Sequence, residues 1–209
     1  SANKSLISGV VMSDHFTRRK KDALLPLVWQ WNHNPDNKLW SVTERKGFLR
    51  LKSGKTDTSF LSARNTLTQR VIGPRCSGAA SLDVSYLKEG DIAGLSLLQI
   101  NYGWIGVTIE NGSKKIVMIN AGGGKPIMQA EVPINETKIY FKVDCDFTDK
   151  RDVAHFFYSL NGKKWTAIGQ PLKMTYTLPH FMGYRYGLFY YATKNIGGFA
   201  DFDWFKINE

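Results

Sequence analysis

The sequence predicts an all-β protein, built as a sandwich of two antiparallel sheets. Apolar and polar residues alternate with a period of two in several runs, such as Leu82, Val84 and Tyr86, and this alternation marks strands with one buried and one solvated face. Turn signals separate the runs. Two of these signals contain Asn-Gly, at residues 111–112 and 161–162, which is the strongest short signal of a hairpin. Many short strands joined by regular turns are typical of a sandwich or a barrel.

The expected strands follow one another along the chain, and no stretch combines a helical period with helix caps. Apolar runs lie on both sides of the turns at residues 110–113 and 160–163. Residues 139–146 alternate through four apolar and four polar positions, which predicts one strand with a buried face. The glycines at 122–124 and 197–198 predict two further turns.

The chain is expected to form one domain over residues 1–209. Sandwiches of this length commonly fold undivided, and the sequence contains no internal repeat, no low-complexity linker and no break in composition. Hydrophobic residues make up 43% and charged residues 22%, which is ordinary for a globular protein with a sizeable core.

The net charge of +10 raises the question of a nucleic-acid or membrane partner. The lysines are dispersed, and the one basic run, Arg18–Lys21, is too short to bind nucleic acid alone, so we interpret the charge as a solvated surface. No run of 18 apolar residues could span a membrane, and no signal peptide is visible. We therefore expect neither nucleic acid nor membrane as a partner. The compartment stays open, with an extracellular or periplasmic location favoured over a cytoplasmic one.

The two cysteines, Cys76 and Cys145, form neither a disulfide framework nor a zinc site. Cys145 shares its predicted face with apolar neighbours and is expected to be buried. Whether the two cysteines pair in a single bridge remains open at the level of sequence.

Catalytic motifs are missing from the sequence. A glycosidase needs two carboxyl groups that flank the scissile bond, and the Glu-x-Asp-x-x-Glu arrangement of sandwich-type glucanases is absent. Glu89 and Asp91 flank a glycine in an expected turn, and Asp144 and Asp146 share a strand face, so we interpret both pairs as solvated. No nucleophile motif, phosphate loop or spaced metal cluster is visible.

Two segments have the composition of a sugar-binding surface. Residues 29–36, followed closely by Trp40, concentrate indoles, amides and an imidazole in one loop, and residues 63–70 place two arginines and a glutamine on a strand. Aromatic rings stack on the apolar faces of sugars, and polar side chains bind their hydroxyls. The alternatives are a loop held by its own tryptophans and a strand whose polar side chains are simply exposed.

Seven segments, in order along nearly the whole chain, resemble the C-terminal domain of family 43 glycoside hydrolases: WNHNP (31–35), LWSVTER (39–45), GFLRL (47–51), ARNTLTQR (63–70), GDIAGL (90–95), FYSLNGKKW (157–165) and GGFADFDWF (197–205). Members of that family are β-xylosidases and α-L-arabinofuranosidases that join a catalytic five-bladed propeller to a concanavalin A-like sandwich, or jelly roll. The propeller is missing from this chain. The resemblance therefore implies an accessory module that either binds xylan or arabinoxylan or completes the active site of a propeller. The alternative is a self-contained concanavalin-like glycosidase or lyase.

The residues expected to bind a xylan-type oligosaccharide, or to dock on a propeller, are those that we expect to converge on one end or one concave face of the sandwich. Rings would stack on the pyranose, and the arginine and amide groups would bind adjacent hydroxyls. The predicted set is Trp31, Asn32, His33, Arg64, Gln69, Tyr102, Trp104 and Tyr190.

The resemblance also implies a structural calcium ion that joins the two ends of the chain. Asp201 and Asp203 are expected on one face of the last strand, with Phe202 and Trp204 facing the core, while Asp14 lies in the first strand-like segment. Calcium prefers six to eight oxygen ligands, carboxylates among them. The alternative is that these acids simply face outward.

Overall fold

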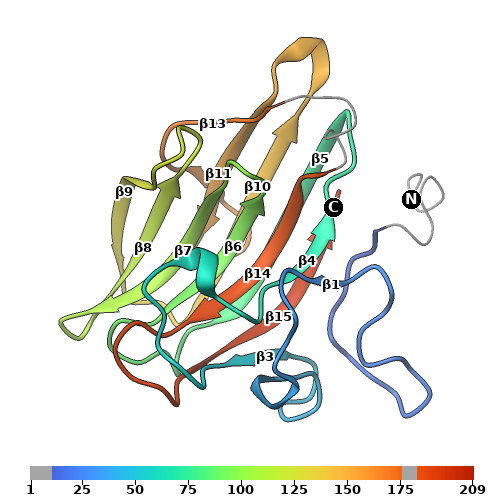
Figure 1. Cartoon of the computed structure of the whole chain (residues 1–209), viewed down its shortest axis with the longest axis vertical. Coiled ribbons are helices and arrows are strands. Elements are labelled where there is room, and N and C mark those ends of the chain that lie inside the picture. Colours follow the sequence, from blue (N-terminus) through green and yellow to red (C-terminus); the bar gives the residue numbers. More distant parts are fainter. Residues whose placement is uncertain (1–10, 176–182) are drawn as a thin grey trace.

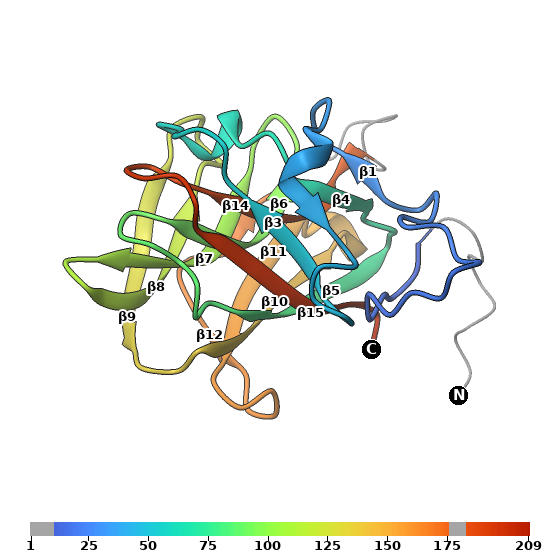
Figure 2. The same cartoon turned by 90° about the horizontal axis from the view of Figure 1, so that it is seen from below.

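The computed structural model describes residues 11–175 and 183–209, which fold into two antiparallel sheets packed face to face (Figures 1 and 2). The predicted all-β sandwich is confirmed. Within these ranges the helical content is three short 3₁₀ turns, none of which could cross a membrane: η1 (Asn37–Leu39), η2 (Phe60–Ser62) and η3 (Thr148–Lys150).

The sheet nearer the viewer in Figure 1, here called the front sheet, has seven strands. In spatial order they are β1 (Gln30–Trp31), β4 (Leu67–Arg70), β14 (Arg185–Tyr191), β6 (Ile92–Leu98), β7 (Gly103–Glu110), β8 (Ser113–Asn120) and β9 (Ile127–Ile134).

The back sheet has eight strands. In spatial order they are β12 (Thr166–Ala167), β11 (Val153–Ser159), β10 (Lys138–Asp146), β5 (Arg75–Asp83), β15 (Phe199–Ile207), β3 (Leu49–Lys52) and β2 (Trp40–Ser41), and β13 (Leu172–Lys173) pairs with β11.

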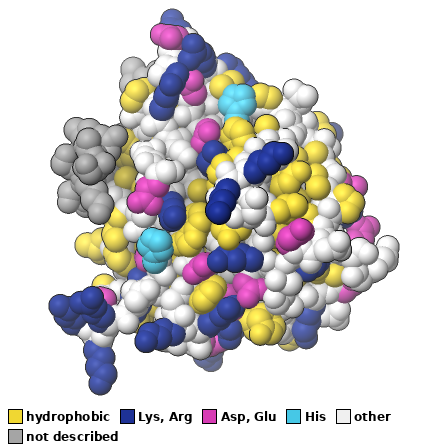
Figure 3. Space-filling model, turned by 180° about the vertical axis from the view of Figure 1, so that it is seen from behind, with side chains coloured by type: hydrophobic (Ala, Val, Ile, Leu, Met, Phe, Trp, Pro, Cys, Tyr) yellow, Lys and Arg dark blue, Asp and Glu magenta, His cyan; other side chains and the backbone are white. Residues whose placement is uncertain are grey.

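The main hydrophobic core fills the space between the two sheets. On β10 the four apolar positions from Ile139 to Cys145 are all buried, as the alternation predicted. They face residues of the front sheet such as Leu95 and Leu188, which belong to the same core cluster. The face of the molecule seen in Figure 3 carries lysines and arginines scattered among acidic and apolar side chains, in keeping with a dispersed charge.

The predicted hairpin at residues 111–112 is confirmed. Asn111 and Gly112 have φ angles of 50° and 76°, the two positive values that a type I′ turn requires, and they join β7 to β8 through the pair Glu110 and Ser113. At residues 161–162 only Gly162 has a positive φ, of 75°, so this turn between β11 and β12 is of a different type.

The start and the end of the described chain lie side by side. Asp14 and Phe205 exchange two backbone hydrogen bonds of 2.8 Å, so the first segment runs along β15. The expectation that Trp204 faces the core is wrong. The register of β15 against β5 shifts between Phe202 and Trp204, and this irregularity turns Trp204 to the outer face, where its ring lies 6.0 Å from that of Tyr140.

Candidate functional site

Two loops at one end of the sandwich are tied together by hydrogen bonds. One loop follows β1 and the other follows η2, and neither belongs to a sheet, so they depend on these bonds for their shape. The bonds are Asn32 N–H to the Thr66 carbonyl (2.9 Å), His33 Nε2 with the Leu61 carbonyl (3.2 Å), Arg64 Nε to the Asn34 carbonyl (2.9 Å), and the Asn65 amide to both backbone groups of Asp36 (3.0 Å each).

A pocket of about 220 Å³ opens beside these loops, between them and the ends of β3 and β14. Most of its lining is polar and comes from four separate parts of the chain. The lining residues are Asp36, Leu39, Lys52, Ser53, Gly54, Lys55, Asp57, Arg64, Asn65, Tyr190 and Tyr191.

One buried wall of the pocket is fixed by Tyr190. Its hydroxyl donates to Asp91 Oδ2 at 2.8 Å and lies 3.2 Å from Ser53 Oγ. The ring is therefore held between the start of β6, which Asp91 precedes, and the end of β3, which Ser53 follows. Burial raises the pKa of Asp91 above its ordinary value, although the Lys88 N–H and the Tyr190 hydroxyl both stabilise the carboxylate. Within the described ranges Asp91 Oδ1 has no hydrogen-bond partner.

The charged groups of the pocket differ in how they are neutralised. Lys55 pairs with Asp57 at 3.0 Å, and Lys52 pairs with Glu44 just outside the pocket. Arg64 donates through Nε to a backbone carbonyl, and no carboxylate of residues 11–175 or 183–209 lies within 4.0 Å of its guanidinium. The two Nη groups of Arg64 are therefore donors that a ligand can reach at this rim.

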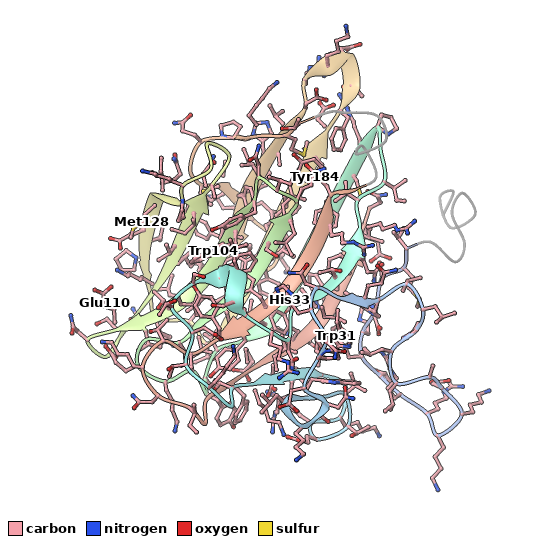
Figure 4. The ribbon with its side chains drawn as sticks, viewed as in Figure 1. Trp31, His33, Trp104, Glu110, Met128 and Tyr184 are labelled. Atoms are coloured by element: carbon pink, nitrogen blue, oxygen red, sulfur yellow. The ribbon has the colours of Figure 1, made fainter. Side chains whose placement is uncertain are left out.

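Five of the predicted binding residues, Trp31 among them, meet at this end of the molecule. Arg64 and Tyr190 line the pocket, and Asn32 and His33 are exposed on the adjoining loop. Figure 4 shows His33 and Trp31 in the same region. Trp31 is half-buried and packs against Trp40, with ring centroids 5.3 Å apart, so its indole also anchors the loop.

Gln69 does not belong to this surface, and its predicted contact with sugar is wrong. Its side chain is fully buried, and its amide accepts from Met12 N–H at 3.0 Å and donates to the Met12 carbonyl at 2.8 Å. The side-chain amide of Gln69 thereby makes with Met12 the two hydrogen bonds that the backbone of a neighbouring strand would make.

Tyr102 and Trp104 do not reach the pocket either. They belong to a second apolar cluster on the outer face of the front sheet, where Phe60 of η2 packs on Tyr102, Trp104 and Phe189 with ring centroids 4.8–6.3 Å apart. Figures 1 and 4 show η2 in front of the sheet and Trp104 beside it. The predicted exposure of these two rings is wrong because η2 covers them.

Of the lining residues, sequence reasoning placed only Arg64 and Tyr190 in the binding set, and it missed the others, among them Lys55, Asp57 and Tyr191. Lys55 and Asp57 lie in a polar loop with no distinctive motif, so no signal marked them. The strand parity of Tyr191 could have marked it, since it lies on the face of β14 opposite to Tyr190. The interpretation of Asp91 as solvated is also wrong, because its side chain is fully buried.

The three carboxylates predicted to bind calcium are each engaged by the protein's own cations. Asp14 accepts two bonds from Arg18, at 2.7 and 2.9 Å, and others from Trp29 Nε1 and Phe16 N–H. Burial alone raises the pKa of Asp14, but these donors outweigh it and leave the pKa below its ordinary value.

Asp201 and Asp203 are each paired with cations other than Arg18, the partner of Asp14. Asp201 is fully buried between Arg45 and Arg50, at 3.1 and 2.8 Å, and Asp203 pairs with Lys138 at 3.1 Å. No group of three metal-binding side chains is present in the described ranges. These carboxylates therefore do not fit a shared calcium ion, because each of them is already paired with an arginine or a lysine.

Comparison with known proteins shows similarity to parts of β-xylosidases and of GH43 proteins. The model of a family described as the β-xylosidase C-terminal concanavalin A-like domain matches residues 13–208. A β-xylosidase from Formosa agariphila is 31% identical over an alignment of 205 positions that covers 88% of this chain and 33% of that protein. The chain spans about a third of the length of the curated relatives it matches.

Two solved structures share the fold closely. A bifunctional GH43-CE protein from Bacteroides eggerthii is 57% identical with a TM-score of 0.93, over 98% of this chain and 26% of that one. A GH43 glycoside hydrolase engineered to display both endo-xylanase and exo-arabinofuranosidase activity is 30% identical with a TM-score of 0.84, over 100% of this chain and 42% of that one.

Proposed function

This chain belongs to the family of β-xylosidase C-terminal concanavalin A-like domains, and from that membership we propose that it serves a family 43 glycoside hydrolase as an accessory domain that binds a xylan-type chain. The pocket lined by Arg64 and Tyr190 is the observation that carries the proposal.

The chemistry of the pocket suits a sugar. Sugar hydroxyls both donate and accept hydrogen bonds, and the lining offers acceptors in Asp36 and Asp57 beside donors in Lys55 and Arg64. Leu39 and Tyr191 add apolar surface for the C–H face of a ring. A few placed polar groups beside apolar ones are the usual composition of a small-ligand site.

The size of the pocket limits what enters it. Its volume of about 220 Å³ lies below the range of about 300–1,000 Å³ that is typical of sites for drug-sized ligands. We therefore propose that the pocket holds one or two sugar units, with the rest of the chain outside.

Calorimetric titration of the protein with xylotriose tests this function. We expect saturable binding that Arg64→Ala weakens about tenfold, since a hydrogen bond from a charged donor contributes about 1.5–3 kcal/mol. Lys125→Ala is the matched control. Lys125 is exposed in the turn between β8 and β9, and its replacement removes one positive charge, as Arg64→Ala does. Absence of binding, or equal binding by the Arg64→Ala protein, would contradict the proposal.

A self-contained glycosidase is the second candidate, because two carboxylates, Asp36 and Asp57, line one pocket. Both are already engaged: Asp36 accepts from Lys38 N–H at 3.0 Å, and Asp57 pairs with Lys55. We therefore expect the protein to leave aryl xylosides and arabinosides intact. Turnover that disappears in Asp57→Asn would establish the enzyme instead.

A further inference from the structure

Two arginines lie directly opposite each other on the front sheet. Arg70 of β4 is the register partner of Arg185 of β14. The next pair, Val71 and Tyr184, is joined by a backbone hydrogen bond of 2.9 Å, so Arg70 and Arg185 form the intervening non-hydrogen-bonded pair. In such a pair the two side chains stand close together on one face of the sheet, with Cβ atoms about 4.5–5.5 Å apart.

The chain offers this arginine pair no carboxylate. In residues 11–175 and 183–209 no carboxylate lies within 4.0 Å of either guanidinium, and the sequences of 1–10 and 176–182 contain no aspartate or glutamate. The polar contact recorded for Arg185 is a long one, 3.4 Å to the Thr68 hydroxyl.

Both side chains are half-buried, which makes their proximity costly. Like charges placed directly opposite in a sheet are destabilising. Burial and the neighbouring Arg70 both lower the pKa of Arg185 below its ordinary value. A cost of this kind is offset when an anion binds between the two cations.

The arginine pair lies on the same sheet face as the candidate pocket. Arg185, Gly187, Phe189 and Tyr191 alternate along β14, and Phe189 and Tyr191 belong to the outer cluster while Leu188 and Tyr190 belong to the main core. Tyr191 lines the pocket, and Arg185 lies six residues earlier on the same strand, about 20 Å away at the usual rise of a strand. One polysaccharide of several units is long enough to reach both places.

We propose that Arg70 and Arg185 bind the carboxylate of a uronic acid unit carried by a xylan-type chain. The inference rests on the proposed function, because it adds an acidic substituent to the same glycan. A planar guanidinium matches a carboxylate with two parallel N–H···O bonds, and two guanidinium groups side by side can hold both carboxylate oxygens.

Two ligands of equal length separate this inference from the proposed function. The protein is titrated with xylotriose and with a xylotriose that carries one glucuronic acid. We expect the ligand that carries glucuronic acid to bind about tenfold more tightly, since bonds to a charged group are worth more than neutral ones, and to lose this advantage as salt rises.

Arg70→Gln and Arg185→Gln should each abolish the preference for the acidic ligand while xylotriose binds as before. Each should also leave the melting temperature of the free protein unchanged or raised, because one member of a repelling pair is gone. Lys125→Gln, with the same loss of charge, should keep the preference. Arg64→Ala should weaken the binding of xylotriose and keep the preference for the acidic ligand, because the pocket and the arginine pair lie about 20 Å apart along β14.

The outcomes are distinct. If both ligands bind equally to the unmodified protein, or if the preference survives in both glutamine variants, the uronic acid site is wrong and the xylan-binding proposal stands. If the two ligands bind equally, a carboxylate of another protein domain is the alternative partner for the arginine pair. If neither ligand binds, the proposed function fails and this inference fails with it.

Discussion

Cys76 of β5 and Cys145 of β10 are cross-strand partners in the back sheet, and both thiols are buried and free. The Tyr186 hydroxyl lies between them, donating to the Cys76 carbonyl at 2.9 Å and lying 3.6 Å from Cys145 Sγ. The structure thus settles a pairing that the sequence left open, in favour of two thiols.

The reactivity of these cysteines should be low in the folded protein. Burial raises the pKa of both thiols, and the thiolate is the reactive form. We expect a thiol reagent to label neither cysteine under native conditions and both after denaturation, and we expect reductant to leave the melting temperature unchanged. Loss of stability on adding reductant would instead indicate a bond between them.

Replacement of Asp14 should destabilise the protein strongly. Asp14→Asn leaves the Arg18 guanidinium, whose side chain is 9% exposed, without its carboxylate, and breaking a buried ion pair costs about 3–5 kcal/mol. Asp203→Asn is the matched control, because its side chain is 30% exposed and its pair with Lys138 should contribute less than about 1 kcal/mol. Urea denaturation at pH 7 measures both changes, and equal effects would contradict the argument.

The contribution of Asp14 should depend on pH in a defined direction. The pKa of Asp14 is lower in the folded protein than its ordinary value of 3.8, so its stabilisation is fully present above pH 3.8 and is lost as the pH falls through the folded value. The difference in unfolding free energy between the unmodified protein and Asp14→Asn should therefore shrink in acid. A constant difference from neutral pH into acid would not be compatible with this.

Asp91 should show the opposite pH dependence. Burial raises its pKa in the folded protein, so folding is favoured while Asp91 is protonated, and stability is lost as the pH rises from 3.8 through the folded value. Asp91→Asn has no proton to lose, and its stability relative to the unmodified protein should increase over that range. Asp149→Asn, at a side chain that is 85% exposed, is the control and should show no such trend.

Chelation tests the predicted calcium ion. Arginine and lysine already engage Asp14, Asp201 and Asp203, so we expect EDTA to leave the melting temperature unchanged and added calcium to have no effect. A melting temperature that falls with EDTA and recovers with calcium would contradict this expectation and show that the protein binds the ion.

The fold was predictable because a strand with one buried and one solvated face requires apolar and polar residues to alternate, and this alternation is visible in the sequence. The alternation from Ile139 to Cys145 and the turn at Asn111 and Gly112 both depend on residues adjacent in the chain. Trp204 broke this rule because a single irregularity in β15 shifts the parity of all later residues, and alternation alone does not reveal where such a shift occurs.

The candidate site was only partly predictable because the burial of a strand residue depends on segments distant in sequence. Arg64 and Tyr190 do reach one pocket. Gln69 is covered because Met12 pairs with it from 57 residues away, and Trp104 is covered by Phe60. Neither partner could be assigned from the local pattern, since both contacts require the three-dimensional path of the chain.

The packing of Phe60 on Phe189 has a consequence for avidity. The ring of Phe60 covers the outer face of β14 at Phe189. The pocket at Tyr191 and the arginine pair at Arg185 are therefore two separate sites along one strand. Under the two proposals, a short oligosaccharide would occupy one of these sites at a time, whereas a polymer that reaches both would gain from the raised effective concentration of its second contact. Two weak contacts of this kind would favour long polysaccharides over their own degradation products, without any need for a tight individual site.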